Sequence, residues 1–84
     1  MTIRELAQFF FKYTEDANMI YYIQIIADNA ETSKLISGAQ KDGDLLLHGI
    51  TVKTQNITEG DSKLGDLEVH AIAIKDENTI SILC

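Results

Sequence analysis

The chain has 84 residues, 45% of them hydrophobic, and its 13 acidic and 7 basic residues give a formal net charge of −6. This length accommodates one domain, and the apolar content suffices for a packed core, which excludes a disordered chain. Nucleic-acid binders carry clustered Lys and Arg that neutralise phosphates. The lysines here are scattered singly, so direct nucleic-acid binding is not expected.

The N-terminal segment is predicted to form an amphipathic helix over residues 3–13. Thr2 and Glu5 have the spacing of a capping box, in which the hydroxyl and the carboxylate bind free backbone amides of the first turn. Four apolar residues then recur at helical spacing, and we expect them to face the core. They are Leu6, Phe9, Phe10 and Tyr13.

Residues 19–27 are rich in β-branched and aromatic residues and are predicted to form a strand. Apolar residues occupy both of its faces, with Ile23 on one face and Tyr22 on the other. A strand of this kind needs a cover on each side. The N-terminal helix can supply one cover, and we expect a second copy of the chain to supply the other. The pattern therefore predicts a homodimer.

The middle of the chain is less clearly patterned. Residues 30–40 are compatible with a short helix capped by Asp28 or Asn29, but Gly38 disfavours it, so the sequence leaves this segment open. Residues 41–44 carry a turn signal.

Residues 45–54 are predicted to form a strand with Leu46, Ile50 and Val52 on one face. Gly49 in this strand indicates a bulge or a close approach of two backbones. Residues 56–65 are polar and are predicted to form a loop.

The C-terminal region is predicted to form a hairpin. Residues 67–75 alternate between apolar and polar, residues 76–78 are turn-forming, and residues 79–84 form the second strand. Together the elements predict one α+β domain over residues 1–84. An N-terminal amphipathic helix would pack on a mainly antiparallel sheet of about four strands, with a second short helix.

The sequence also indicates the cellular compartment of the protein. The longest strongly apolar stretch is too short to cross a bilayer as a helix. No apolar h-region of a signal peptide follows Arg4 and Glu5. The single cysteine, Cys84, excludes an internal disulfide. These features predict a protein of the reducing cytoplasm that does not bind membranes.

Residues suited to catalysis or metal binding are few. His48 and His70 could form half a metal site with Glu68, but a structural zinc site takes four ligands. Neither histidine has a serine or cysteine at a spacing that suggests nucleophilic catalysis. The paired carboxylates lie in predicted turns, whereas acid–base catalysis needs a carboxylate with a shifted pKa. We therefore expect no metal, no cofactor and no enzymatic activity.

The acidic residues are the best candidates for a binding site, because most of them fall in predicted connections. If the strands run alternately up and down, one end of the sheet collects an acidic patch. Its proposed partner-binding residues are Asp28, Asp42, Asp44, Asp76 and Glu77, with Glu31 nearby. Acidic patches steer basic partners, although acids also simply keep a small protein soluble.

Two functions are compatible with these patterns. The first is a non-catalytic protein-binding module, a small acidic inhibitor of a partner with a basic or nucleic-acid-binding surface. Phage-encoded inhibitors, including anti-CRISPR proteins, have this size and charge, but the chain carries no motif of such a family. The alternative is a homo-oligomer that holds or sequesters a small ligand between subunits. The two-faced strand at residues 19–27 and the surplus of aromatic residues favour this alternative.

Overall fold

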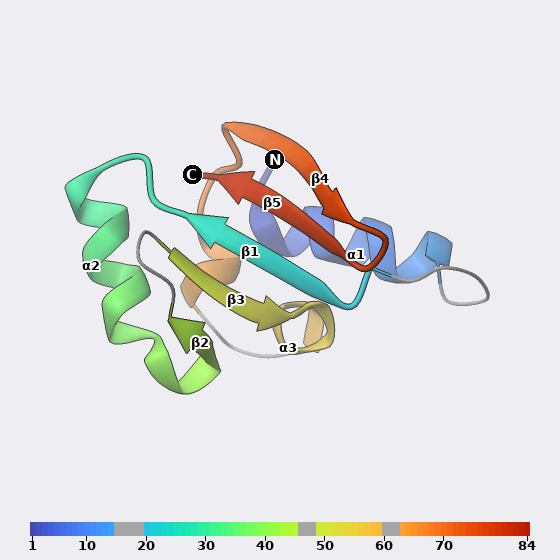
Figure 1. Ribbon diagram of the computed structural model, residues 1–84, viewed down its shortest axis with the longest axis horizontal. Helices are drawn as coiled ribbons and strands as arrows, with labels where there is room; N and C mark the ends of the chain where they lie inside the picture. Colours follow the sequence, from blue (N-terminus) through green and yellow to red (C-terminus); the bar gives the residue numbers. More distant parts are fainter. Residues whose placement is uncertain (15–19, 46–48, 60–62) are drawn as a thin grey trace.

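The computed structural model describes residues 1–14, 20–45, 49–59 and 63–84, which form three α-helices, two 3-10 helices and five strands (Figure 1). In chain order the elements are α1 (Ile3–Thr14), β1 (Tyr22–Ile26), α2 (Ala30–Gly38), η1 (Gln40–Asp42), β2 (Gly43–Leu45), β3 (Gly49–Lys53), α3 (Thr54–Glu59), η2 (Lys63–Asp66), β4 (Ala71–Asp76) and β5 (Thr79–Leu83). The predicted α+β class and the second helix are confirmed. The sheet has five strands instead of the expected four.

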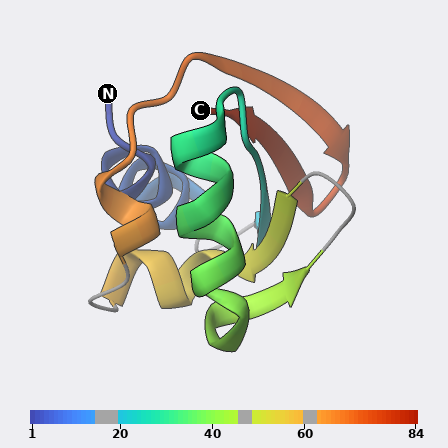
Figure 2. The same ribbon diagram turned by 90° about the vertical axis from the view of Figure 1, so that its left-hand side faces the viewer.

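The strand order in the sheet is β2-β3-β1-β5-β4. β1 pairs parallel with β5, and the other three pairs are antiparallel, so the sheet is mainly antiparallel as predicted. The helices α1, α3 and η2 cover one face of the sheet (Figures 1 and 2). Helix α2 lies across the end of the sheet where β1 ends. No described helix covers the other face, which we call the open face.

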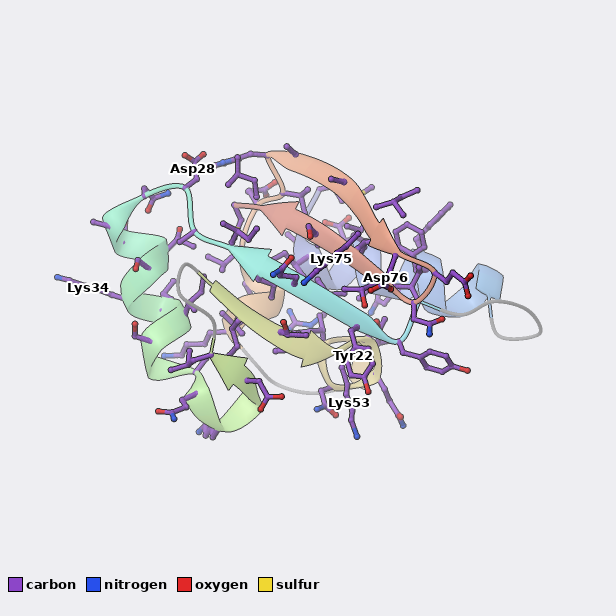
Figure 3. The ribbon with its side chains drawn as sticks, viewed as in Figure 1. Tyr22, Asp28, Lys34, Lys53, Lys75 and Asp76 are labelled. Atoms are coloured by element: carbon purple, nitrogen blue, oxygen red, sulfur yellow. The ribbon has the colours of Figure 1, made fainter. Side chains whose placement is uncertain are left out.

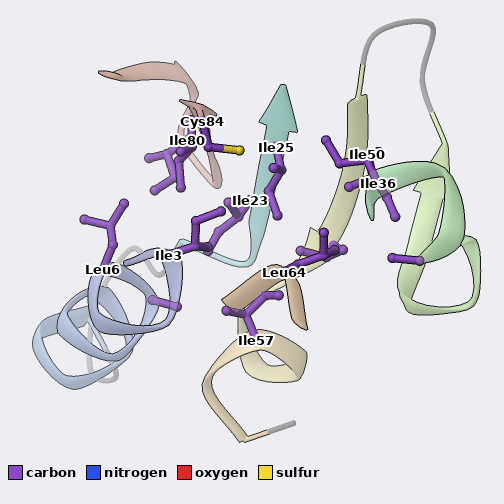
Figure 4. Packing of buried hydrophobic residues seen from close by; sticks show 14 residues of the cluster. Ile3, Leu6, Ile23, Ile25, Ile36, Ile50, Ile57, Leu64, Ile80 and Cys84 are labelled. Atoms are coloured by element: carbon purple, nitrogen blue, oxygen red, sulfur yellow. The ribbon is translucent and has the colours of Figure 1, made fainter. Parts of the chain in front are cut away.

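The core lies between the sheet and the covering helices (Figure 4). Alternate residues of the three central strands point into it and are almost fully buried. They are Ile23, Ile25, Ile50, Val52, Ile80 and Ile82. Their partners on the opposite face are more exposed, which is the alternation expected of a sheet with one buried and one solvated face.

The capping box of α1 is confirmed. The Thr2 amide donates to Glu5 Oε1 at 3.1 Å, and the Glu5 amide donates to Thr2 Oγ1 at 3.2 Å. Hydrogen bonds from Thr2 lower the pKa of the Glu5 carboxyl. The reciprocal bonds satisfy two amides that a helix start leaves unpaired.

The buried stripe of α1 differs from the predicted one. Ile3, Leu6 and Ala7 are buried and Phe10 packs against the core, whereas Phe9 is 51% exposed. The buried stripe has the expected helical spacing but begins at Ile3. It therefore includes Phe10 and leaves Phe9 on the solvent side of the helix. The prediction that Phe9 faces the core is therefore wrong. The side chain of Tyr13 lies outside what the structure describes.

The open question over residues 30–40 is settled by α2. The Asn29 side chain caps this helix, because its Oδ1 accepts a hydrogen bond from the Thr32 amide at 2.9 Å. The helix buries Thr32 and Ile36, and Gly38 is its last residue, where its weak helix propensity matters least.

The strand predicted over residues 45–54 is confirmed over residues 49–53 as β3, but Leu45 belongs to a separate strand, β2. β2 and β3 pair antiparallel, with Gly43 opposite Val52 and Leu45 opposite Ile50. The close approach predicted at Gly49 is confirmed: a Cβ there would lie 2.1 Å from the Ile25 carbonyl oxygen. The predicted strand residue Leu46 lies outside the described residues.

The predicted loop over residues 56–65 is also wrong where the structure describes it. Residues 54–59 form α3 and residues 63–66 form η2. Each helix buries one apolar side chain, Ile57 and Leu64 respectively. Burial of these two isolated apolar residues outweighs the polar composition of the segment, since tertiary contacts routinely override local propensity.

The predicted C-terminal hairpin is confirmed as β4 and β5, although β4 begins at Ala71 and not at residue 67. The preceding segment pairs instead with the N-terminus. The Ile3 amide donates to the Leu67 carbonyl at 2.9 Å, and the Val69 amide donates to the Met1 carbonyl at 2.8 Å. These bonds hold the start of α1 beside η2.

A matched pair of substitutions tests the observed stripe. Leu6→Ala should lower the free energy of unfolding by about 2–5 kcal/mol, because it leaves a cavity in the core. Phe9→Ala should cost only about 1 kcal/mol, because half of this side chain is already exposed; its ring makes an edge-to-face contact with Phe10, with ring centroids 5.7 Å apart. Urea unfolding measures both. Equal losses for the two variants would contradict the burial of α1 described here.

Cys84 makes stability depend on pH in the alkaline range. Burial, with a smaller contribution from the Asp28 carboxylate, raises the pKa of its thiol from 9.0 to about 11. The folded chain therefore keeps the thiol proton at pH values where the unfolded chain releases it. Stability from this group is present below pH 9 and is lost as the pH rises towards 11.

We expect the unfolding equilibrium constant to rise by up to about tenfold per pH unit across this window because of Cys84. Cys84→Ala should remove this part of the slope while keeping a small apolar side chain in place. Urea unfolding of both chains at pH 8 to 11 measures it, and the difference between them cancels the titration of tyrosine and lysine. Parallel pH profiles would contradict the shifted pKa.

Candidate functional site

The predicted acidic end of the sheet does not form. Because β1 and β5 are parallel, Ile26 lies opposite Leu83 and Tyr22 lies opposite Thr79. Asp28 follows the end of β1, whereas Asp76 and Glu77 precede β5 and so lie at the other end of the sheet (Figure 3). The assumption that strands alternate in direction along the chain caused the error.

The remaining acids of that group are also dispersed. Asp44 lies in β2, the edge strand opposite β4, where it pairs with Thr51. Glu31 lies in the first turn of α2. The side chain of Asp42 lies outside what the structure describes.

The most unusual surface is β4, an edge strand of the sheet. All six of its residues are exposed, and Ile72 and Ile74 are 48% and 82% exposed. These isoleucines lie opposite Ile82 and Ile80 and so share the helix-covered face of the sheet, yet no described helix reaches far enough to bury them. In an antiparallel edge strand, every second residue also points its amide and carbonyl outward.

Natural proteins usually protect such an edge with short length, charges, proline or a bulge. In β4, the register shift lies between Ile74 and Asp76, so the bulge and the charges occur only at its C-terminal end. Residues 71–74 therefore carry no charge and no bulge that would prevent another strand from pairing with them.

Acidic side chains flank both ends of β4. At its start, Asp28 Oδ2 lies 2.9 Å from His70 Nδ1, and Glu68 Oε2 lies 3.1 Å from the Met1 amino group. At its end, Asp76 accepts a hydrogen bond from the Asn78 amide at 2.8 Å, next to exposed Glu77. Three of the predicted partner-binding residues, Asp28, Asp76 and Glu77, thus lie around β4, although at opposite ends of it.

The open face carries a short apolar row and a polar row. Ile26, Leu83 and Ala71 lie side by side across β1, β5 and β4. In the next row Ser81 Oγ donates to Gln24 Oε1 at 2.6 Å. Residue Tyr22, also on this face, is 41% exposed. The second face of the predicted two-faced strand is therefore partly polar and open.

A hollow of about 430 Å³ lies on the open face near the start of β1. Its polar lining includes residues from β1, η1, β2, β3 and α3: Tyr22, Gln40, Lys41, Asp44, Lys53 and Asn56. Register places Tyr22 directly opposite Lys53 (Figure 3). Sequence reasoning missed this hollow because five separate elements build it.

Neither a metal site nor a membrane-spanning helix is present among the described residues. Within the described ranges, no group of three or more His, Cys, Asp or Glu side chains is placed to hold a metal ion. His70 contacts Asp28, and His48, its predicted metal-site partner, lies outside those ranges. None of the helices in the described part of the chain is long and apolar enough to span a membrane.

Comparisons with known proteins add no family to this description. No protein-family model matches the chain, and no curated protein or solved structure matches it.

Proposed function

We propose that the protein is a non-catalytic protein-binding module that adds a strand of a partner protein to the edge of its sheet at β4. The single observation that carries this proposal is the exposure of Ile72 and Ile74 on an edge strand with no charge in its first four residues. An edge of this kind is a liability in a soluble protein unless something pairs with it. A functional partner strand is the simplest reason to keep it.

Strand addition also explains the composition of β4. In this mode the main chain supplies hydrogen bonds, and alternate side chains supply specificity. Ile72 and Ile74 lie two residues apart on one face of the strand. A partner strand with two apolar residues at the same spacing would bury them in cross-strand pairs. The small residues Ala71 and Ala73 leave the other face free of obstruction.

Charge indicates the kind of partner. The chain carries a net charge of −6, and acids stand at both ends of β4. A partner strand flanked by Lys or Arg would meet opposite charge at each end and be steered towards the site. Two antiparallel β4 strands would instead bring Asp76 and Glu77 of one copy to the acidic start of the other. This favours a basic partner, in keeping with an inhibitor that occupies a basic surface.

A synthetic peptide with two lysines at each end and alternating valine and threonine between them tests this mode. Its addition should shift and protect the backbone amides of residues 71–76 in NMR spectra. Ile74→Lys should weaken binding by about tenfold or more, because it removes an apolar anchor and repels the basic peptide. Affinity should also fall as salt rises above about 0.15 M, where the Debye length is about 8 Å.

The matched control is Leu35→Lys, which adds the same charge at another exposed apolar residue, on α2. It should bind the peptide nearly as well as the unchanged chain. Equal weakening of peptide binding by both substitutions would show that the change in net charge, and not the loss of Ile74, causes the weakening. Shifts that avoid β4 altogether would reject strand addition.

The alternative function, a homo-oligomer that holds or sequesters a small ligand between subunits, is favoured by one specific observation. The open face has no described cover, and it exposes Leu83 beside half-buried Ile26 and Tyr22 at the other end of β1. Two copies packed through their open faces would bury this apolar row.

For this alternative we expect the sedimentation mass to rise from monomer to dimer with concentration. Leu83→Lys should return the protein to a monomer, because the free energy of burying a charge in the apolar row exceeds the free energy gained from the interface contact. Leu35→Lys again serves as the control and should leave the dimer intact. A monomer mass that is independent of concentration in the unchanged chain would reject self-association.

A further inference from the structure

We propose that the hollow on the open face binds a free nucleoside monophosphate. The site lies within one chain and requires neither the strand-adding partner nor a dimer. Its volume of about 430 Å³ lies within the range of roughly 300–1,000 Å³ found for small-molecule sites. Two of its lining residues, Gly43 and Thr51, have closely packed backbones, because a Cβ on Gly43 would lie 2.2 Å from the Thr51 carbonyl oxygen.

The described residues of the hollow carry more basic than acidic groups, in contrast to the protein as a whole. Lys41 and Lys53 line it from η1 and β3, and Asp44 is the one carboxylate among its described lining residues. No ion pair between described side chains includes either lysine. In a chain of net charge −6, two lysines that line one concave surface favour an anionic group there. A phosphate has several acceptor oxygens and can accept hydrogen bonds from two lysines at once.

The other lining groups suit a planar, hydrogen-bonding ring. Tyr22 is 41% exposed and stands directly opposite Lys53, so a ring stacked on the phenol keeps its anionic substituent within reach of the ammonium group. Bases stack well on aromatic side chains. Gln40 and Asn56 both donate and accept hydrogen bonds, and Asp44 accepts one from an exocyclic amino group. Together these groups match an amino-bearing base joined to a phosphate.

Adenosine 5′-monophosphate is the probe. Titration followed by NMR should give saturable shifts at the amides of Tyr22, Thr51 and Lys53, with a dissociation constant on the order of 1 mM or below. Adenosine and inorganic phosphate, tested separately, should each bind more weakly, because each supplies only half of the contacts. Adenosine binding as tightly as the nucleotide would overturn the phosphate assignment.

The double variant Lys41→Gln, Lys53→Gln should weaken binding of the nucleotide by about tenfold. The control is Lys34→Gln, Lys63→Gln, which removes the same charge from α2 and η2, away from the hollow. Figure 3 shows Lys34 at the left-hand edge of the molecule, well apart from Tyr22 and Lys53 near its lower middle. All four lysines are exposed, so both variants should fold, and their NMR spectra confirm it. Equal weakening in both variants, or no saturable shift at the hollow, would overturn the proposal.

Discussion

Parallel pairing between β1 and β5 determines how the rest of the chain is arranged. Ile23 and Ile25 lie opposite Ile80 and Ile82, and all four side chains are buried. Because β4 and β5 are joined by a tight turn, β4 must lie on the far side of β5 and becomes an edge. The other side of β1 is left for β3. One pairing thus sets both the core and the position of the exposed strand.

Local features of the fold were predictable because neighbouring residues determine them. The capping box needs only Thr2 and Glu5, and the C-terminal hairpin needs only two short apolar runs around a turn. The stripe of α1 was less certain, since three consecutive phenylalanines fit a helical spacing in more than one phase. Burial of Ile3 and Ala7 decides the phase, and only the tertiary structure shows that burial.

Features that depend on distant segments were not predictable. The helices over residues 54–59 and 63–66 form because Ile57 and Leu64 reach the core from a polar segment. The acidic residues were grouped wrongly because their positions depend on strand direction. The hollow shows the same limit: Tyr22 and Lys53 are 31 positions apart in sequence, and only strand register places them opposite each other. Residues that are this far apart in sequence form no linear motif.

The central strand pairing also has a consequence for how the chain folds. The hydrogen bond between Gln24 and Ser81 joins residues 57 positions apart, so the middle of the sheet closes over a long loop. Helices and the terminal hairpin can form quickly by themselves, but pairing of this separation is slow. Until β5 docks, β1 carries an open apolar edge. The folding chain is therefore most exposed to aggregation while this long loop is still open.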